Sequence, residues 1–410
     1  GNYDLSLIYF TGNSDLALSY DALLGADSAL NPAGVAPGGI DALVAATFSE
    51  TNPEVRIRQF SELAAAVDEQ AVVGVLVHPV QPIVTAPGIE INADRLRLFG
   101  GFNLRGIHRV GDAAPVVEAA PVVEYEAPPE DSSIGYAWSI PLKSLDPHAT
   151  TSNFDPIYIG LAYDTLIVRE FDGTFSPMLA TSWEFVEPDV LELKLREGVT
   201  FHGGRAFDAE AVVLNFERVT TAESSTRGGP LAAAIASVEA VDSMTVRMTL
   251  GDGPGVIFGA LSSMGGMMIN PDAFDTDLSV TADGTGPYRV TQVLAAESVT
   301  FKRFEDTWAP EDARVSNLKI VTNKDSAQRV NLLLTGDVDA TNIDTHQIEM
   351  LEEKGYTTHF RVGEDAFVMQ LNWERIPDVG ARQAIESSID RALILEGIHK
   401  GVSEAGGQVQ

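Results

Sequence analysis

The sequence predicts a mixed α/β fold, in which strands and helices follow one another irregularly. Leucines alternate with charged residues over 191–195, which is typical of a half-buried strand, and the stretch 244–250 alternates in the same way. Between them, residues 209–219 have apolar side chains at helical spacing behind Asp208, a favourable N-cap residue. Because these elements do not repeat as strict strand–helix–strand units, a mixed sheet is expected rather than a purely parallel one.

The first part of the chain carries similar signals. Residues 3–9 alternate in polarity and predict a mostly buried strand, followed by a turn at 11–14. Residues 54–70 have the spacing of an amphipathic helix, and 71–77 predict a short buried strand that stops at Pro79. A helix followed by a strand again indicates an α/β unit.

A change of composition separates the two parts. The hexapeptide AAPVVE occurs twice in tandem, at 113–118 and 119–124, and is followed by YEAPPE. Proline-rich segments stay extended at about 3 Å per residue, so this stretch could span on the order of 70 Å. We therefore divide the chain into residues 1–110, a linker at 111–136, and residues 137–410.

The charge and composition exclude several classes of function. The 59 acidic and 27 basic residues give a net charge of −32, which repels nucleic acids and anionic membrane surfaces. The chain has no cysteine, so it has neither disulfides nor thiolate chemistry. Its apolar runs are far shorter than the ~20 residues that span a bilayer.

The sequence contains no recognisable catalytic or metal-binding constellation. The seven histidines include no pair at helical metal-ligand spacing, so neither a metal nor another cofactor is expected. His202 and the carboxylates Asp337 and Asp339 lie in turn-like stretches, which favours structural roles. The GTGPYRV stretch has glycines but Pro287 interrupts it where a dinucleotide-binding loop would need a helix. We therefore expect no enzymatic activity.

One long motif carries a specific resemblance. The run SPMLATSWEFVEPDVLELKLREGVTFHGGRAFDAEAVVLNFERV resembles the signature of the family 5 extracellular solute-binding proteins, the peptide and nickel receptors of ABC importers. Four further matches follow the order and spacing of that family: SLDPH at 144–148, YDTLIV at 163–168, GTGPYRV at 284–290 and ARQAIESSIDRALI at 381–394.

The first 110 residues resemble the C-terminal part of the same family. The matching stretches are GNYDLSLIYFTGNSD at 1–15, NPAGVAPGGIDALV at 31–44 and residues 56–86. The two ends are thus exchanged and a middle stretch is missing, which fits either a circularly permuted receptor with a deletion or a fragment spanning two receptors. In a permuted receptor the strand at 3–9 and the helix at 57–67 should pack against 367–398, whereas two fragments should sit apart.

The resemblance implies a periplasmic-binding-protein-like α/β fold, with two lobes of mixed sheet and flanking helices around a cleft. It implies a monomeric receptor that delivers a peptide-like or other small polar solute to ABC transporter permease subunits, in the periplasm or outside the cell. Any signal peptide or lipid anchor is expected to lie outside this chain. The alternative from another class is a secreted glycosidase or peptidase, which would need two cleft carboxylates about 5 to 10 Å apart with raised pKa values.

The resemblance also implies ligand contacts in the loop that follows the first strand. In peptide-binding members a carboxylate after this strand pairs with the ligand's α-ammonium, since a buried cation needs a charge-assisted hydrogen bond. Asn13 takes that place here, beside Tyr9 and Phe10, and Asp15 is the second candidate. If Asn13 is the counterpart, a neutral, blocked or sugar-like solute is favoured; the competing interpretation is a plain turn.

Two further segments are expected to line the cleft. Asn153 and Phe154 follow the LDPHATT stretch, and Asn372 and Trp373 follow the strand FVMQL. Aromatic walls with a few amide groups provide apolar contact and orientation, which is how most small-ligand sites work.

Overall fold

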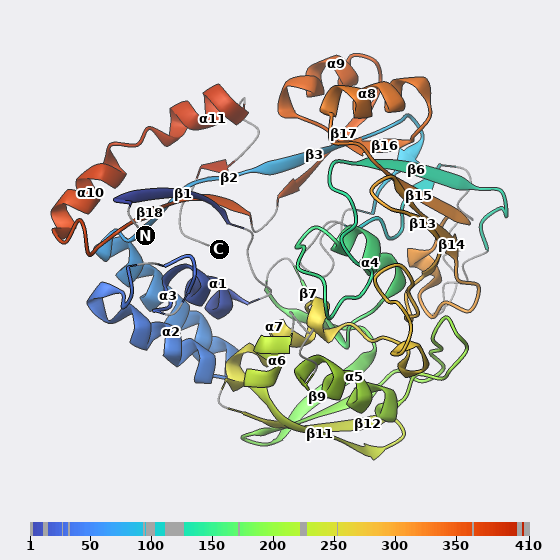
Figure 1. The fold of residues 1–410 in the computed structure, drawn as a ribbon, viewed down its shortest axis with the longest axis horizontal. Coiled ribbons are helices and arrows are strands. Elements are labelled where there is room, and N and C mark those ends of the chain that lie inside the picture. The colour runs from blue at the N-terminus through green and yellow to red at the C-terminus, as the bar shows by residue number, and fades with distance from the viewer. Residues whose placement is uncertain are drawn as a thin grey trace.

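The computed structural model describes residues 3–10, 15–26, 28–31, 33–92, 95, 103–110, 127–170, 173–221, 228–251, 253–362, 365–399 and 404–405. The α-helices are α1 (Leu16–Leu24), α2 (Ile40–Ser49), α3 (Pro53–Gln70), α4 (Pro156–Ala162), α5 (Ala209–Thr221), α6 (Gly228–Ala234), α7 (Ile257–Leu261), α8 (Ser326–Thr335), α9 (Ile348–Glu352), α10 (Val379–Ser387) and α11 (Arg391–His399). Short 3-10 helices are η1 (Pro37–Gly39), η4 (Pro254–Val256), η5 (Met264–Gly266), η6 (Pro271–Ala273), η7 (Pro310–Asp312) and η8 (Thr345–Gln347). Figure 1 shows these helices packed around three main sheets.

A seven-stranded sheet forms one part of the molecule. Its strands, in spatial order, are β13 (Tyr288–Leu294), β14 (Ser298–Arg303), β15 (Asn317–Thr322), β6 (Ser133–Trp138), β16 (Ala340–Asn342), β3 (Val80–Thr85) and β17 (Thr357–Val362). The three central strands β15, β6 and β16 are parallel, and the other pairs are antiparallel. Alternate residues of β6 point to opposite faces, so Tyr136 packs with α4 and Ala137 packs with α8 and α9.

A four-stranded antiparallel sheet forms a second part. Its order is β1 (Leu5–Phe10), β18 (Ala366–Leu371), β2 (Val73–His78) and β19 (Glu404–Ala405). Helices α1, α2 and α3 cover one face, where Leu23 and Leu63 meet Val75, and helices α10 and α11 lie over the other (Figure 1). Asn52 caps α3 by accepting hydrogen bonds from the next residues' N–H groups.

The third sheet is antiparallel in the order β11 (Ile235–Asp242), β12 (Thr245–Leu250), β10 (Val190–Leu195) and β9 (Ala180–Glu187). The leucines of β10 are buried against α5, as their alternation predicts. The Asp208 carboxylate accepts a hydrogen bond from the N–H of Ala211 at 2.9 Å and begins α5 where the sequence places it. Two short ribbons complete the sheets, β4 (Ile89–Glu90) with β5 (His108–Arg109) and β7 (Ile167–Arg169) with β8 (Phe175–Pro177).

Residues 1–110 and 137–410 share two of these sheets. In the four-stranded sheet β18 lies between β1 and β2, with Leu5 opposite Leu371 and Val75 opposite Val368. In the seven-stranded sheet β3 lies between β16 and β17. Phe60 of α3 also packs against the core below α5. This is the packing expected if the two blocks belong to one receptor.

Two details differ from the sequence-based expectations. The strand β1 is not mostly buried: Leu7 is 67% exposed, and Leu5 and Tyr9 are also exposed. The reason is that β1 lies at the edge of its sheet. On the face covered by α10 and α11, it is Leu371 and Met369 of the neighbouring strand β18 that pack against the helices. The predicted linker ends earlier than residue 136, since β6 begins at Ser133. Most of that linker, 111–126, lies outside the described residues.

Candidate functional site

The chain passes between the seven-stranded sheet and the sheet of β1 at two neighbouring places. Strand β2 leads into β3 at residues 78–80, and β17 leads into β18 just before Ala366 (Figure 1). His78 Nδ1 lies 3.2 Å from the backbone oxygen of Asp365, and the side-chain N–H of Gln81 donates to the Asp365 carboxylate at 3.4 Å. The two crossings are thus tied together, and bending there would move the two sheets relative to each other.

A pocket of about 320 Å³ lies beside these crossings. It is formed where β6 and β16 end and β3 begins, and its lining consists of Val80, Gln81, Pro82, Trp138, Ser139, Ile140, Phe154, Asn342, Ile343, Asp344 and Thr345. Parallel strands present their carboxyl ends at one edge of a sheet, so the segments after β6 and β16 converge there.

The pocket combines two aromatic side chains with several polar ones. Trp138 and Phe154 supply the aromatic surface, and the side-chain N–H of Asn342 donates to Ser139 Oγ at 3.1 Å. The Oδ1 atom of Asn342 is buried and accepts no hydrogen bond from the described residues. Asp344 is exposed at the rim, and the lining residues include no lysine, arginine or histidine.

Buried side chains hold these walls in place. Arg329 donates to the backbone oxygen of Asn342 at 3.1 Å and to that of Asn323 at 2.9 Å, which fixes the end of β16. Behind Phe154, the Asp155 carboxylate accepts hydrogen bonds from the backbone N–H groups of Lys143 and Ser144. Burial raises the pKa of Asp155, and these hydrogen bonds act in the opposite direction.

The SLDPH loop is anchored by His148. Its Nε2 donates to the backbone oxygen of Met267 at 2.9 Å, and its Nδ1 accepts from Arg218 at 2.8 Å. Arg218 also binds the Asp146 carboxylate at 2.6 Å. Burial and the neighbouring Arg218 lower the pKa of His148 to about 4, so the ring is neutral and serves as a structural connector.

The structure places Phe154 in the pocket wall and Asn153 next to it at the surface. Asn153 does not line the pocket. These two residues are on the seven-stranded side of the molecule, so they are separated in the fold from the expected contacts on the sheet of β1.

The residues of β1 that were expected to contact a ligand point to opposite faces of the sheet. Tyr9 is partly exposed on the outer face, with its ring edge-on to Phe367 at 5.0 Å. Phe10 points to the opposite face and is buried among α1, α2 and α3, so it has no surface left for a solute. Asn13 lies outside the described residues.

Asp15 has a structural role, which corrects the expectation that it is available to a ligand. Both of its carboxylate oxygens bind Arg56, at 2.5 and 2.6 Å, and it caps α1 by accepting from the N–H of Ala17 at 2.8 Å. Arg56 is held in turn by the backbone oxygen of Thr47. Three of its roughly four acceptor positions are thus used and the side chain is 4% exposed, so it is not presented to a solute ammonium.

Asn372 and Trp373 are structural as well. Asn372 is buried and accepts from the backbone N–H groups of Glu374 and Arg375, which forms the turn after β18. Trp373 is buried in the core of α1–α3 and donates to the backbone oxygen of Val35 at 3.1 Å. The sequence predicts the end of this strand correctly. The two side chains that follow it stabilise the turn and the core, and neither lines the described pocket.

The pocket residues that sequence reasoning missed are Trp138, Asn342 and Asp344. One signal was present: a polar stretch directly after the motif GDVDA, where a short strand ends. Side chains at the carboxyl ends of neighbouring parallel strands meet, but the sequence does not show that β6 and β16 are neighbours.

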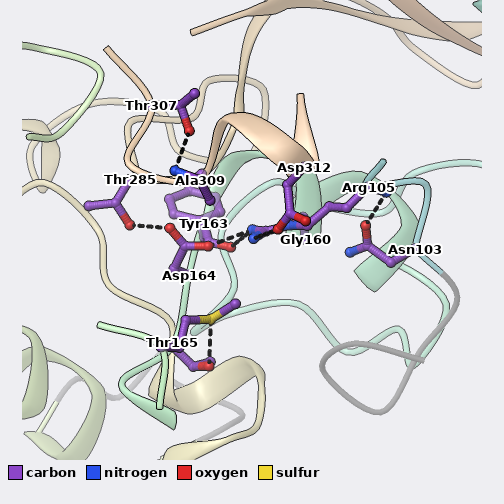
Figure 2. Close-up of polar contacts among 12 residues, drawn as sticks. Asn103, Arg105, Gly160, Tyr163, Asp164, Thr165, Thr285, Thr307, Ala309 and Asp312 are labelled. Carbon is purple, nitrogen blue, oxygen red and sulfur yellow. Dashed lines mark hydrogen bonds and ion pairs between the residues drawn. The ribbon is translucent and has the colours of Figure 1, made fainter. Parts of the chain in front are cut away.

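A buried ionic cluster lies deeper in the same core (Figure 2). Arg105 is fully buried, pairs with Asp164 at 2.6 Å and Asp312 at 3.3 Å, and donates to the backbone oxygens of Gly160 and Tyr163. Asp164 in turn accepts from the Thr285 hydroxyl at 2.8 Å and the Trp308 ring N–H at 2.9 Å. These charges are satisfied by one another, so the cluster joins the YDTLIV, GTGPYRV and EDTWAP stretches and offers no site for a ligand.

The glycines of GTGPYRV serve this same junction. A Cβ on Gly284 would lie 2.3 Å from the backbone oxygen of Ala162, and one on Gly286 would lie 2.6 Å from the carbonyl carbon of that residue. Only glycine allows the two backbones to approach so closely. The motif is therefore a packing motif rather than a phosphate-binding loop.

Several kinds of site are not found in the part of the chain that the structure describes. No group of three or more histidine, aspartate or glutamate side chains there could hold a metal ion. No described helix is both long and apolar enough to cross a membrane. Of the residues lining the pocket, Asp344 alone carries a carboxylate, so the pair that a glycosidase needs is not assembled there.

The comparisons with known proteins agree with this architecture. A family model described as bacterial extracellular solute-binding proteins, family 5 (middle), matches residues 174–409. The glutathione-binding protein GsiB of Pectobacterium atrosepticum is 28% identical over 216 residues, which is 51% of this chain and 42% of that protein. GsiB of Escherichia coli K12 is 25% identical over 254 residues, covering 61% of this chain and 49% of that protein.

Solved structures of periplasmic binding proteins are similar to this chain over about half of its length. One of them is the ABC transporter-associated periplasmic binding protein DppA from Helicobacter pylori in complex with the peptide STSA, with a TM-score of 0.50, 25% identity, and coverage of 54% of this chain and 48% of that chain. The fold is thus that of the periplasmic binding proteins, as the sequence predicts. Because the family model matches more than half of the chain, the chain belongs to the bacterial extracellular solute-binding proteins of family 5. The chain spans about half the length of the curated relatives it matches.

Proposed function

We propose that this chain is an extracytoplasmic solute-binding protein that captures a peptide-like or other small polar solute and delivers it to the permease subunits of an ABC transporter. The observation that supports this function is the aromatic-walled pocket beside the two strand crossings. A solute in this pocket that also touched the sheet of β1 would favour a closed arrangement over an open one. The relatives named above bind glutathione and a peptide, which supports a peptide-like solute.

The proposal includes the protein's setting. The chain would act as a monomer in the periplasm or outside the cell, and would reach the membrane through the transporter or a lipid anchor. It would carry out no covalent chemistry. The rival hydrolase would need a second carboxylate beside Asp344, and the pocket lining supplies none.

Residues near the pocket and the β1 loop define the proposed contacts. Phe154 and Trp138 would contact the apolar part of the solute, with Asn153 at the rim, and Asn13 would contribute from the opposite sheet, as the family resemblance implies. Replacing Asn13 with aspartate should then raise the affinity for peptides with a free amine more than for their N-acetylated forms.

The test is calorimetric titration of the chain with dipeptides, tripeptides, glutathione and the peptide STSA. Phe154→Ala should lower the affinity for any peptide that binds by about tenfold, since buried aromatic contacts contribute more than 1 kcal/mol to binding. Phe185→Ala is the matched control, because Phe185 is an exposed aromatic on β9 outside the pocket. Equal losses for both variants, or no binding by any peptide, would contradict the proposal.

A further inference from the structure

We infer that the pocket beside the crossings takes a positively charged, hydrogen-donating group of the solute, such as a primary ammonium attached to an apolar or aromatic chain. This inference rests on the proposed function and specifies the chemistry of its site. It comes from the side chains that line the pocket, which include one carboxylate, several amide and hydroxyl groups, and no cation.

The first acceptor is Asn342 Oδ1. The amide nitrogen of Asn342 is used by Ser139, while its oxygen is buried and accepts nothing from the described residues. A buried acceptor without a donor destabilises the protein, because the group has lost its hydrogen bond to water. A solute group with N–H bonds would remove that cost if the Asn342 side chain turned its buried oxygen into the pocket on binding.

The second acceptor is the Asp344 carboxylate. Its position is fixed by a capping box at the start of η8: the Asp344 side chain accepts from the backbone N–H of Gln347, and the backbone N–H of Asp344 donates to Gln347 Oε1 at 2.9 Å. The guanidinium of Arg329 donates to the backbone oxygens of Asn342, Asn323 and Lys324 and does not line the pocket. It interacts electrostatically with Asp344 and offsets part of that charge. Asp344 is still the one charged side chain in the lining, and the net charge of −32 adds to the negative potential there.

The aromatic walls suit the same kind of group. Ring faces attract cations, and Trp138 and Phe154 provide two rings in the lining. The rings also bury the apolar chain next to the ammonium. A pocket of about 320 Å³ holds a group of that size but not a large peptide.

An anionic group would be disfavoured in the same place. A carboxylate or phosphate would face Asn342 Oδ1 and the Asp344 charge, and none of the lining side chains is a cation that could pair with it. A neutral solute would lose only the ionic part of the attraction. The expected order of affinity is thus cation, then neutral, then anion.

A charge series with a constant shape tests this order. The probes are phenethylammonium, 2-phenylethanol and 3-phenylpropionate, titrated into the full chain at low salt and at 0.5 M NaCl. We expect phenethylammonium to bind most tightly and to weaken in salt, and 2-phenylethanol to be unaffected by salt. Equal binding of the three probes would overturn the inference, while peptide binding in the assay of the proposed function would leave that function standing.

Two variants identify the atoms responsible. Asp344→Asn should weaken phenethylammonium about fivefold and leave 2-phenylethanol unchanged, as expected for one partly exposed ion pair. Asn342→Asp, which keeps the shape and turns the amide into acceptors alone, should tighten phenethylammonium. Asp275→Asn is the matched control, since it changes the charge equally at an exposed site away from the pocket.

The outcomes separate the two proposals. If peptides bind and Asp344→Asn behaves like Asp275→Asn toward phenethylammonium, the charge selection is wrong and the receptor function stands. If neither peptides nor any of the three probes bind, both proposals fail. Unchanged thermal unfolding of Asp344→Asn confirms that a loss of binding reflects the site rather than the fold.

Discussion

The guanidinium of Arg105 lies 2.6 Å from the carboxylate of Asp164, and neither side chain is exposed to solvent. Arg105 belongs to the first block of the sequence and Asp164 to the second, so this ion pair joins the two blocks inside the core. Removing two charges from water is costly, and the surrounding hydrogen bonds to Gly160, Tyr163, Thr285 and Trp308 offset that cost (Figure 2).

We predict that Arg105→Met lowers the free energy of unfolding by about 3 to 5 kcal/mol, because it leaves Asp164 charged and buried without its cationic partner, while Asp312 keeps only its ion pair with Arg95. Urea unfolding followed by circular dichroism measures this. Arg375→Met is the matched control: Arg375 pairs with Asp4 at the surface, so its loss should cost less than about 1 kcal/mol. Similar losses of unfolding free energy in both variants would show that the buried ion pair stabilises the fold no more than the surface ion pair does.

A second prediction concerns acid. Burial lowers the pKa of His148 and of His202 to about 4, whereas an unfolded histidine has a pKa of about 6.5. Between these values the unfolded chain binds protons that the folded chain does not, so the free energy of unfolding falls as the pH drops from about 6.5 to 4. The loss is on the order of 3 kcal/mol for each histidine.

Urea unfolding at several pH values between 7.5 and 4.5 checks this sign. His148→Gln removes one titrating group, so its free energy of unfolding should approach that of the unmodified chain as the pH falls. His346→Gln is the control, because His346 is exposed on η8. Parallel pH profiles for the chain and for His148→Gln would contradict the assignment of His148 as a buried neutral ring.

Elements governed by local patterns were predictable from the sequence. The alternation over 191–195 and the apolar spacing after Asp208 specify β10 and α5. Both the repeat of apolar residues and the N-cap of the helix depend only on residues close together in the sequence. The helix at 54–70 corresponds to α3 in the same way, although the apolar side chain of Ile57 in this stretch is exposed.

Features that depend on distant partners were not predictable. The exposure of Leu7 depends on where α10 and α11 lie, some 370 residues later in the chain. The role of Asp15 depends on Arg56 reaching it from another helix. The pocket could not be found because its walls come from segments far apart in the sequence, whose adjacency only the sheet order defines.

The third prediction separates the two roles of Asp15. Asp15→Asn keeps a cap acceptor for the Ala17 N–H but removes the charge that pairs with Arg56, whereas Asp15→Ala removes both. Asp15→Ala should therefore be less stable than Asp15→Asn by about 1 kcal/mol, the usual value of an N-cap. Thermal or urea unfolding measures the difference. If Asp15→Asn instead left stability unchanged and abolished peptide binding, Asp15 would be a ligand contact after all.

The last prediction concerns salt. With 59 acidic and 27 basic residues the chain repels itself, and this repulsion is strongest when few ions screen it. The screening length falls from about 10 Å at 0.1 M to about 3 Å at 1 M, so long-range repulsion is largely removed over this range. Salt also weakens exposed ion pairs such as Arg375 with Asp4, but such pairs contribute little, and the excess of 32 negative charges dominates. We expect the midpoint of thermal unfolding to rise from 0.05 M to 1 M KCl, measured by scanning calorimetry. Sucrose at matched osmolality is the control for exclusion effects, and a midpoint that stays flat or falls in KCl would show that self-repulsion does not limit the stability of this chain.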